Sequence, residues 1–410
     1  MAESHPEKAS RSHRLKGGAA MWAVAAELAA IYLISNLPSP LYEGYREAFG
    51  FSEITLTLIY SVYVVGSIGT LFFLGRLSDQ VGRRPVLLAS FGLGGLSALV
   101  FLFAGSTPWL FVGRVLSGFA IALATGAGTA WILELHPRQD EGAATRTALV
   151  ATSVGLGLGP LLSGVLAEYG PWPLRLSYLG VLPVLGLAAL FAWRSEESVE
   201  DEKPLEEATV KPRLGVPREL LGAFITPAIA AFVSFALLGF CSSLLPTVIT
   251  HALHVTNVAV GGAVVAGLFL VGALTIATAP SWKPRSGMLA GLVLLVPGTV
   301  CLVLAEALHA MGWLLLGTLI AGVATGLGYR FGLQRVNELS PDDRHAEVIS
   351  SYLIVCYVGI SLPVIGIGLV SSATSSLFAD VLFGALIVAL AFAALGYELW
   401  PSHRRQPAEA

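Results

Sequence analysis

The segment Gly75-Arg76-Leu77-Ser78-Asp79-Gln80-Val81-Gly82-Arg83-Arg84-Pro85 separates two long apolar runs, at 53–74 and 86–105. A helix crosses a lipid bilayer in about 20 apolar residues, so each run is long enough to form one span. The charged segment between the runs is too polar to enter the lipid. We therefore expect a tight turn at the membrane surface, in which glycines supply the backbone freedom that the turn requires.

The composition of the whole chain also indicates a membrane protein. Of its 410 residues, 55% are hydrophobic and only 12% are charged, whereas soluble proteins carry about 25% charged residues. A soluble chain this apolar would aggregate, because its polar groups could not cover its surface. The composition excludes a soluble enzyme, a secreted disulfide scaffold and a nucleic-acid-binding domain, for which the net charge of -3 offers no basic patch. The lipid bilayer is the expected environment.

Apolar runs of helix length recur along the entire chain, separated by short polar hinges. Each run is interpreted as one membrane-spanning helix, which gives twelve. The predicted spans are 17–38, 53–74, 86–105, 108–133, 145–167, 175–193, 222–250, 257–279, 287–305, 312–334, 348–371 and 376–397.

The positions of Lys and Arg support this number of spans. With the N-terminus in the cytoplasm, all but three of the 24 basic residues fall in cytoplasmic segments, the exceptions being Arg46, Arg114 and Arg175. Cytoplasmic loops carry such an excess of basic residues, and a missed or invented span would destroy the asymmetry. We predict an all-α membrane protein of twelve transmembrane helices with both termini cytoplasmic.

One long polar segment divides the spans six by six. It is acidic and contains three prolines, which is typical of a flexible cytoplasmic linker. We expect an N-terminal tail at 1–16, a first six-helix half at 17–193, the linker at 194–221, a second half at 222–398 and a C-terminal tail at 399–410. Two such halves in one chain are typical of secondary transporters, whose substrate site lies between them.

The segment that follows the second span resembles the signature loop of the major facilitator superfamily, G-x-L-a-D-r-x-G-r-k, at nearly every position. It departs from that pattern at Gln80, where a basic residue is common. The resemblance implies the two-half fold of this family. It also implies that the loop's Asp79 holds the cytoplasmic side shut against a helix of the second half and releases it during transport. The implied gate residues are Gly75, Asp79, Gly82, Arg83 and Arg84.

Two further segments of the first half resemble elements of the same family. Arg114 and Gly118 match its R-x-x-x-G pattern in the fourth span, and 155–164 is similar to its g-x-x-x-G-P-x-x-G element. The second resemblance implies an antiporter, especially a drug/proton exporter. From the residues alone, the glycines predict a close helix contact and the proline a bend. This bend motif comprises Gly155, Gly159, Pro160 and Gly164.

Glu27 is the acidic residue that falls in the middle of a predicted span, and Arg114 is the basic residue deepest in one. Helix rise places them about 6 Å apart along the membrane normal. Two interpretations follow. Either they form a fixed ion pair that orients two helices, or Glu27 is the protonation site for which proton and substrate compete, with Arg114 tuning its acidity.

Further candidates for the cavity wall are polar or aromatic residues at helical spacing. They are Tyr60, Tyr63 and Ser67 in the second span, Phe235 in the seventh and Tyr352 in the eleventh, all of which could equally be packing residues. His251 and His254 have helical metal-ligand spacing, but the sequence places no further ligand beside them, so we expect no metal site and no cofactor. The second turn with basic residues, 281–287, lacks an acid.

The sequence thus predicts a proton-coupled secondary transporter that exports small lipophilic molecules or drugs by alternating access. The alternative is a symporter or exporter of a specific metabolite such as a sugar or amino acid. An enzyme is not expected, because the sequence shows neither a catalytic constellation nor a nucleotide-binding motif. A bacterial inner membrane is the expected location, protons and a small-molecule substrate are the expected partners, and one chain suffices to form both halves.

Overall fold

The computed structural model describes residues 15–75, 77–199, 203–207, 215–341 and 344–400. Within them, twelve helices are long and apolar enough to cross a membrane, and they follow the twelve predicted runs one to one. The all-α, twelve-span fold class is therefore confirmed.

The described residues of the first half form nine α-helices, of which α5 is a single short turn. They are α1 (Gly17–Asn36), α2 (Tyr42–Phe49), α3 (Glu53–Ser61), α4 (Tyr63–Leu74), α5 (Leu77–Val81), α6 (Arg83–Leu102), α7 (Thr107–Glu134), α8 (Glu141–Tyr169) and α9 (Leu176–Arg194). The second half follows the same plan with seven. They are α10 (Leu221–Ser243), α11 (Leu245–His251), α12 (Val258–Thr278), α13 (Pro284–Ala307), α14 (Met311–Leu339), α15 (His345–Ala373) and α16 (Ser376–Leu399).

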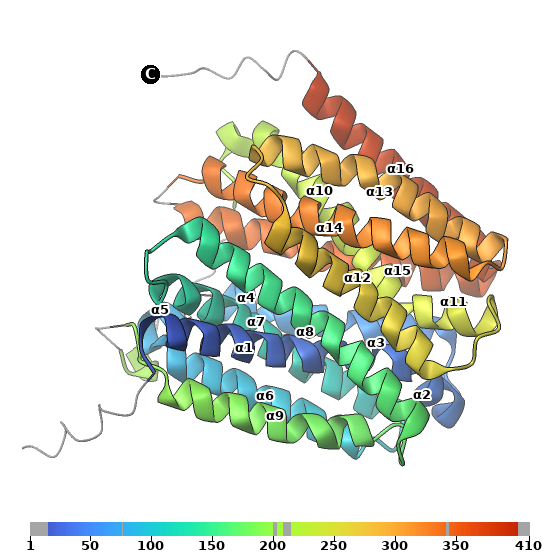
Figure 1. Ribbon diagram of the computed structural model, residues 1–410, viewed down its shortest axis with the longest axis horizontal. Helices are drawn as coiled ribbons and strands as arrows, with labels where there is room; N and C mark the ends of the chain where they lie inside the picture. The colour runs from blue at the N-terminus through green and yellow to red at the C-terminus, as the bar shows by residue number, and fades with distance from the viewer. Residues whose placement is uncertain (1–14, 76, 200–202, 208–214, 342–343, 401–410) are drawn as a thin grey trace, which may run out of the picture.

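Each half is a bundle whose helices pack mainly on one another. In the first half α7 packs on α1, α4 and α6, and in the second α14 packs on α10, α12 and α13. Figure 1 shows the two bundles one above the other. They meet chiefly where α8 lies along α12 and where α3 lies against α15.

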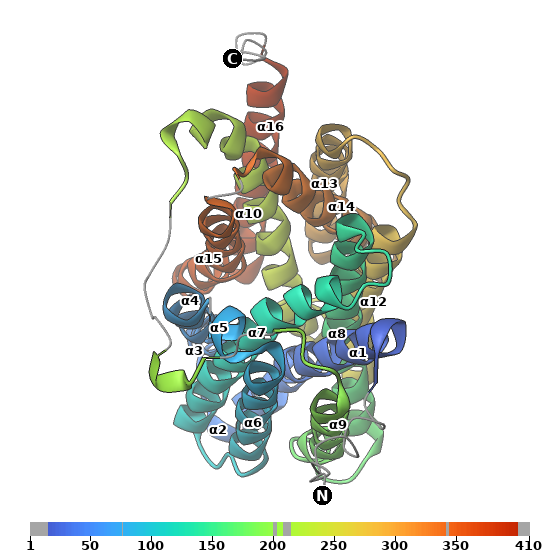
Figure 2. The same cartoon turned by 90° about the vertical axis from the view of Figure 1, so that its left-hand side faces the viewer.

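The described termini lie at one end of the bundle, which we call the linker end. There Leu15 donates from its backbone N–H to the carbonyl of Arg194 at 3.0 Å, and the N–H of Glu196 donates to the carbonyl of Leu15 at 3.2 Å. α5 lies at this end, which faces the viewer in Figure 2. α2 and α11 lie at the other end of the bundle, which we call the opposite end (Figure 1).

Two predicted spans are interrupted in the structure. The run 222–250 divides into α10 and α11 at Leu244, because Pro246 in the first turn of α11 cannot donate a backbone hydrogen bond to continue the helix. The run 53–74 divides into α3 and α4 at Val62. Hydropathy alone does not reveal either break, since the residues on both sides are apolar.

Candidate functional site

Arg114 on α7 lies buried near the opposite end, with 2% of its surface exposed. Its guanidinium donates to the carbonyl of Ser35 at 2.6 Å and to the carbonyl of Tyr60 at 2.9 Å. These carbonyls belong to the last turns of α1 and α3, where the helices leave backbone acceptors unused. The guanidinium also lies over the rings of Tyr63 and Tyr60, at 4.5 and 5.3 Å from their centroids. Carbonyl dipoles and ring faces therefore compensate its charge.

Glu27 does not pair with Arg114. Among the described residues, neither oxygen of its carboxyl group has a hydrogen-bond partner, and 1% of the residue is exposed. Arg114 reaches α1 at Ser35, which lies about 12 Å further along the helix than Glu27. The fixed ion pair, one of the two interpretations of the sequence, is therefore not formed, because the arginine finds its acceptors at helix ends rather than at a carboxylate.

Glu27 also lies on a different face of α1 from Tyr32. Ile31 lies four residues after Glu27 and therefore on the same face of α1. Its side chain packs against Gly94 of α6, where a Cβ would lie 3.2 Å from the Ile31 Cδ1. The hydroxyl groups of Tyr32 and of Thr125 on α7 instead share a hydrogen bond of 2.7 Å. Glu27 therefore lies inside the packing of the first half, away from the face that carries Tyr32.

A cluster of tyrosines lies where the two halves approach each other. Tyr357 on α15 lies close to Tyr32, Ser67 and Thr125 of the first half. Tyr329 on α14 packs edge to face on Phe235, with ring centroids 4.9 Å apart. We call this group, with Tyr32, the interface cluster; its members are Tyr32, Ser67, Thr125, Phe235, Tyr329 and Tyr357.

The sequence analysis selected part of this cluster. Ser67 and Phe235 are members, and Tyr63 and Tyr60 lie beside it around Arg114. Tyr352 instead packs inside the second half, where its buried hydroxyl faces Gly332 of α14. Four further members were missed, and they are Tyr32, Thr125, Tyr329 and Tyr357. Hydroxyl-bearing residues in four separate spans give no common pattern, so only the packing of the spans brings them together.

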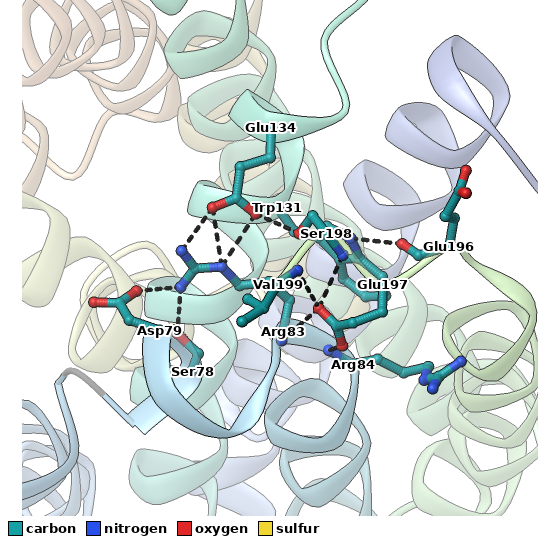
Figure 3. Close-up of polar contacts among 10 residues, drawn as sticks. All are labelled: Ser78, Asp79, Arg83, Arg84, Trp131, Glu134, Glu196, Glu197, Ser198 and Val199. Atoms are coloured by element: carbon teal, nitrogen blue, oxygen red, sulfur yellow. Dashed lines mark hydrogen bonds and ion pairs between the residues drawn. The ribbon is translucent and has the colours of Figure 1, made fainter. Parts of the chain in front are cut away.

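The signature loop forms a polar network at the linker end, shown in Figure 3. Arg83, the first residue of α6, donates to Ser78 at 2.8 Å and forms an ion pair with Asp79. On its other side it binds Glu134, the last residue of α7, at 2.7 Å. Asp79 is thus held by an arginine of its own turn, and this network ties α5, α6 and α7 of the first half together.

The start of the linker completes the network. The carboxylate of Glu197 accepts hydrogen bonds from the backbone N–H groups of Arg83 and Arg84, both at 2.9 Å, and so caps α6. Ser198 donates to Glu134. Gly82 has a φ of +103°, and a Cβ there would lie 2.9 Å from the Glu197 carboxylate. The side chain of Arg84 points away from the network (Figure 3).

Residues 195–199 are therefore docked on the first half, where the sequence predicted flexible chain. The indole N–H of Trp131 donates to the carbonyl of Glu196 at 3.0 Å, and Lys203 donates from its backbone to Gln80 at 2.7 Å. Residues 200–202 and 208–214 of the predicted linker, like Arg76 of the loop, lie outside the described residues.

The second half has a related ion pair that the sequence did not reveal. Arg285 at the start of α13 donates to Glu398 at the end of α16, at 2.6 Å. Glu398 also accepts a hydrogen bond from Thr226 of α10 at 2.8 Å. The acid that the turn 281–287 lacks is supplied from more than a hundred residues away, so in both halves an arginine of this turn is paired with a glutamate.

The bend motif lies where α8 contacts both α1 and α12. A Cβ at Gly155 or Gly159 would collide with the carbonyl oxygens of Ala29 and Leu33 on α1. A Cβ at Gly164 would lie 2.9 Å from the carbonyl oxygen of Val258, at the start of α12. Pro160 lies inside the helix. One face of α8 thus packs closely on α1 of the first half, and another face packs closely on α12 of the second half.

Polar contacts between helices of the two halves gather at the opposite end. Glu43 of α2 binds His251 of α11 at 2.9 Å, and Ser61 donates to the carbonyl of Ser361 at 3.3 Å. Ser39 donates to the carbonyl of Ser242. In this structure the halves are therefore joined at the end remote from the signature loop.

The chain matches the Major Facilitator Superfamily over residues 28–364, and it belongs to that family. A 152-residue stretch is 27% identical to the putative multidrug resistance protein MdtD of Salmonella paratyphi B, covering 37% of this chain and 32% of that protein. The match therefore spans about a third of the length of MdtD. The chloramphenicol resistance protein CraA of Acinetobacter baumannii is 27% identical over 326 residues, covering 74% of this chain and 75% of CraA.

Solved transporter structures share the fold. The nucleoside transporter NupG has a TM-score of 0.70 at 12% identity, covering 92% of this chain and 99% of its own. A bacterial homologue of the human lysosomal transporter Spinster, inward-facing and unoccupied, has a TM-score of 0.68 at 17% identity, covering 99% and 100%. The human organic anion transporter MFSD10 has a TM-score of 0.67 at 16% identity, covering 95% and 100%. The chain's membership of the Major Facilitator Superfamily and its twelve apolar helices, and not these likenesses of fold, identify the protein as a multi-pass membrane transporter.

Proposed function

We propose that this transporter is a proton-coupled exporter of small lipophilic molecules, with Glu27 as the acid that carries the proton. The observation that carries the proposal is the burial of the Glu27 carboxyl group, which has no hydrogen-bond partner in the described part of the chain. A charge in that position is costly in the membrane, and binding a proton removes the cost. The acid is therefore poised to exchange a proton whenever its surroundings open to water.

The geometry favours an indirect coupling. Glu27 and Tyr32 lie on different faces of α1. A substrate bound to the interface cluster, to which Tyr32 belongs, would therefore not touch the carboxyl group of Glu27. We propose that the charge of Glu27 changes the packing of α1 on α6, and that α1 transmits the change to α8 through the close contacts at Gly155 and Gly159. Proton and substrate would then compete through the position of a helix.

We propose that the linker end faces the cytoplasm of a bacterium, since the basic residues gather there and the resistance proteins MdtD and CraA are bacterial. The two six-helix halves, which the linker separates in the sequence, would rotate relative to each other about the contact between α8 and α12. The signature-loop network would hold the first half rigid during this motion. One chain contributes both halves, so a monomer would suffice.

The substrate class follows from the interface cluster. Its members from the second half are aromatic, and Tyr357 supplies the hydroxyl that faces the first half. Aromatic faces bind lipophilic and cationic molecules without demanding a fixed hydrogen-bond pattern. A transporter of one sugar or amino acid would require several convergent hydrogen-bonding groups from both halves, so that alternative is less favoured.

The test is proton movement in proteoliposomes after addition of lipophilic cations, neutral antibiotics or sugars. We expect a lipophilic substrate to drive proton release with the wild type and not with Glu27→Gln, which keeps the size of the side chain but cannot titrate. Glu207→Gln, at an exposed acid of the linker, is the matched control. Normal proton release in the Glu27→Gln protein would remove Glu27 from the coupling.

A further inference from the structure

A second pair of buried acids lies in the other half of the molecule, at the opposite end. Glu306 is in the last turn of α13 and Asp380 is in the second turn of α16. They are 7% and 4% exposed, and their carboxyl groups lie close to each other where both residues line the same two cavities. In the part of the chain that the structure describes, neither carboxyl group forms an ion pair with a basic side chain.

The pair lies at the junction of two cavities. The outer cavity has a volume of about 170 Å³, which has room for several water molecules. First-half residues Arg46 and Glu53 line it together with second-half residues Thr247, His251 and Ser376. The inner cavity has a volume of about 10 Å³, close to the space of a single water, and is otherwise lined mainly by apolar side chains.

An unused hydroxyl group points to a ligand in the inner cavity. Thr299 on α13 lines this cavity together with Glu306 and Asp380. It is 2% exposed, and its Oγ1 has no hydrogen-bond partner among the residues that the structure describes. Buried hydroxyl groups are nearly always hydrogen bonded in folded proteins. The position next to the acid pair thus suits a water molecule or a protonated carboxyl group.

The surrounding charges do not neutralise the pair. Arg46 and His251 line the outer cavity, but both are within ion-pair distance of Glu43, at 3.7 and 2.9 Å. Glu53 on α3 adds another negative charge facing the pair. Two carboxylates in contact repel each other strongly in apolar surroundings, and one shared proton removes that repulsion. The described residues contain no group of three side chains that could hold a metal ion.

We propose that Glu306 and Asp380 form a proton-binding site that is reached from the opposite end through the outer cavity. The two carboxyl groups share one proton, and Thr299 hydrogen bonds to the water or carboxyl group beside them. The site is separate from Glu27 and does not depend on its role. Because Glu53 of the first half faces the pair, the bound proton also favours the contact between the halves at this end.

Infrared spectroscopy of the protein in lipid nanodiscs tests this directly, since a protonated carboxyl group has its own carbonyl band. The measurement is made in the Glu27→Gln background, so that Glu27 adds nothing to that band. We expect a protonated-carboxyl band at neutral pH that disappears in the Glu306→Gln/Asp380→Asn double variant. Asp380→Glu, which keeps the carboxyl group, is expected to retain it.

The single variants Glu306→Gln and Asp380→Asn guard against misfolding of the double variant. Each is expected to shift the band, because the remaining carboxyl group has a new hydrogen-bond partner. The proposal is overturned if none of these variants alters the spectrum at neutral pH. It is also overturned if the band grows when sodium is removed at fixed pH, because the site would then hold a metal cation in place of the proton.

Discussion

The Nε of Arg285 lies 2.6 Å from the Oε1 of Glu398, and a similar pair joins Arg83 to Glu134 at 2.7 Å. In each half an arginine at the start of the third span binds a glutamate at the linker-end terminus of another span. A glutamate would destabilise a helix C-terminus by itself, because the helix dipole is negative there. The arginine compensates that charge and fixes the two helix ends relative to each other.

A double-mutant cycle on Arg285→Gln and Glu398→Gln measures this pair. The side chains are partly exposed, so we expect a coupling free energy of about 1 kcal/mol, at the upper end for such pairs. Thermal unfolding in detergent gives the four stabilities. The matched control is the pair of Arg335 and Glu338 within α14, whose charged atoms are 3.7 Å apart and whose glutamate is the more exposed of the two glutamates. We expect less than half that coupling for it. Equal couplings would contradict the structural role of Glu398.

Replacement of Gly82 by alanine should disrupt the cap of α6. The residue has a φ of +103°, and its Cβ would approach the Glu197 carboxylate that binds the helix start. We expect Gly82→Ala to lower the free energy of unfolding by about 1–2 kcal/mol. Gly69→Ala is the control, since its Cβ would meet nothing within 4 Å. If both variants unfold at the same temperature, the docking of Glu197 on α6 is not significant for stability.

Arg114→Lys should weaken the first half even though the charge is kept. An ammonium group has no planar fork, so it cannot reach the carbonyls of Ser35 and Tyr60 together. We expect a loss of about 1.5–3 kcal/mol in the free energy of unfolding, the usual contribution of a hydrogen bond to a charged group. Arg335→Lys on the surface serves as the control. Identical melting curves for the two variants would show that the bridging geometry does not matter.

The close contact of α8 with α1 predicts a steric effect at Gly159. Its Cβ would collide with the carbonyl oxygen of Leu33, a backbone atom that cannot move aside alone. We expect Gly159→Ala to cost about 1–3 kcal/mol of stability and to reduce export more than expression. Gly95→Ala, whose Cβ would meet nothing within 4 Å, should behave as the wild type in both assays. Full export by Gly159→Ala would exclude this contact from the transport motion.

One pH effect can be assigned outside the membrane-spanning helices. Asp140 caps α8, and the hydrogen bond from the backbone N–H of Ala143, at 2.9 Å, lowers the pKa of its carboxyl group. A lowered pKa means that the stabilisation is present above the ordinary pKa of about 3.9 and is lost as the pH falls through the folded-state value. Asn also caps a helix but does not titrate. In the Asp140→Asn variant the melting temperature should therefore fall less steeply at acidic pH than in the wild type. Parallel acid limbs would contradict this assignment.

The sequence by itself determined the number of spans, their order and the class of protein. Hydropathy fixes spans because lipid offers no partners for backbone polar groups, so every long apolar run must become a helix. The loop containing Asp79 identified the family because its residues act locally, within one turn and its neighbours. The left-handed backbone of Gly82 belongs to the same short range, whereas the Glu197 carboxylate that caps α6 comes from more than a hundred residues away.

Only the tertiary structure decided which distant groups meet. Glu27 and Arg114 looked like partners by depth, yet the arginine binds the ends of α1 and α3, because helix termini concentrate unused acceptors. Asp380 lies in an apolar run and gave no sign that Glu306 from another span would lie beside it. Apolar helices can pack in lipid with many relative rotations and membrane depths that differ little in free energy. Close glycine contacts and polar pairing select one of them, and these interactions depend on residues far apart in the chain.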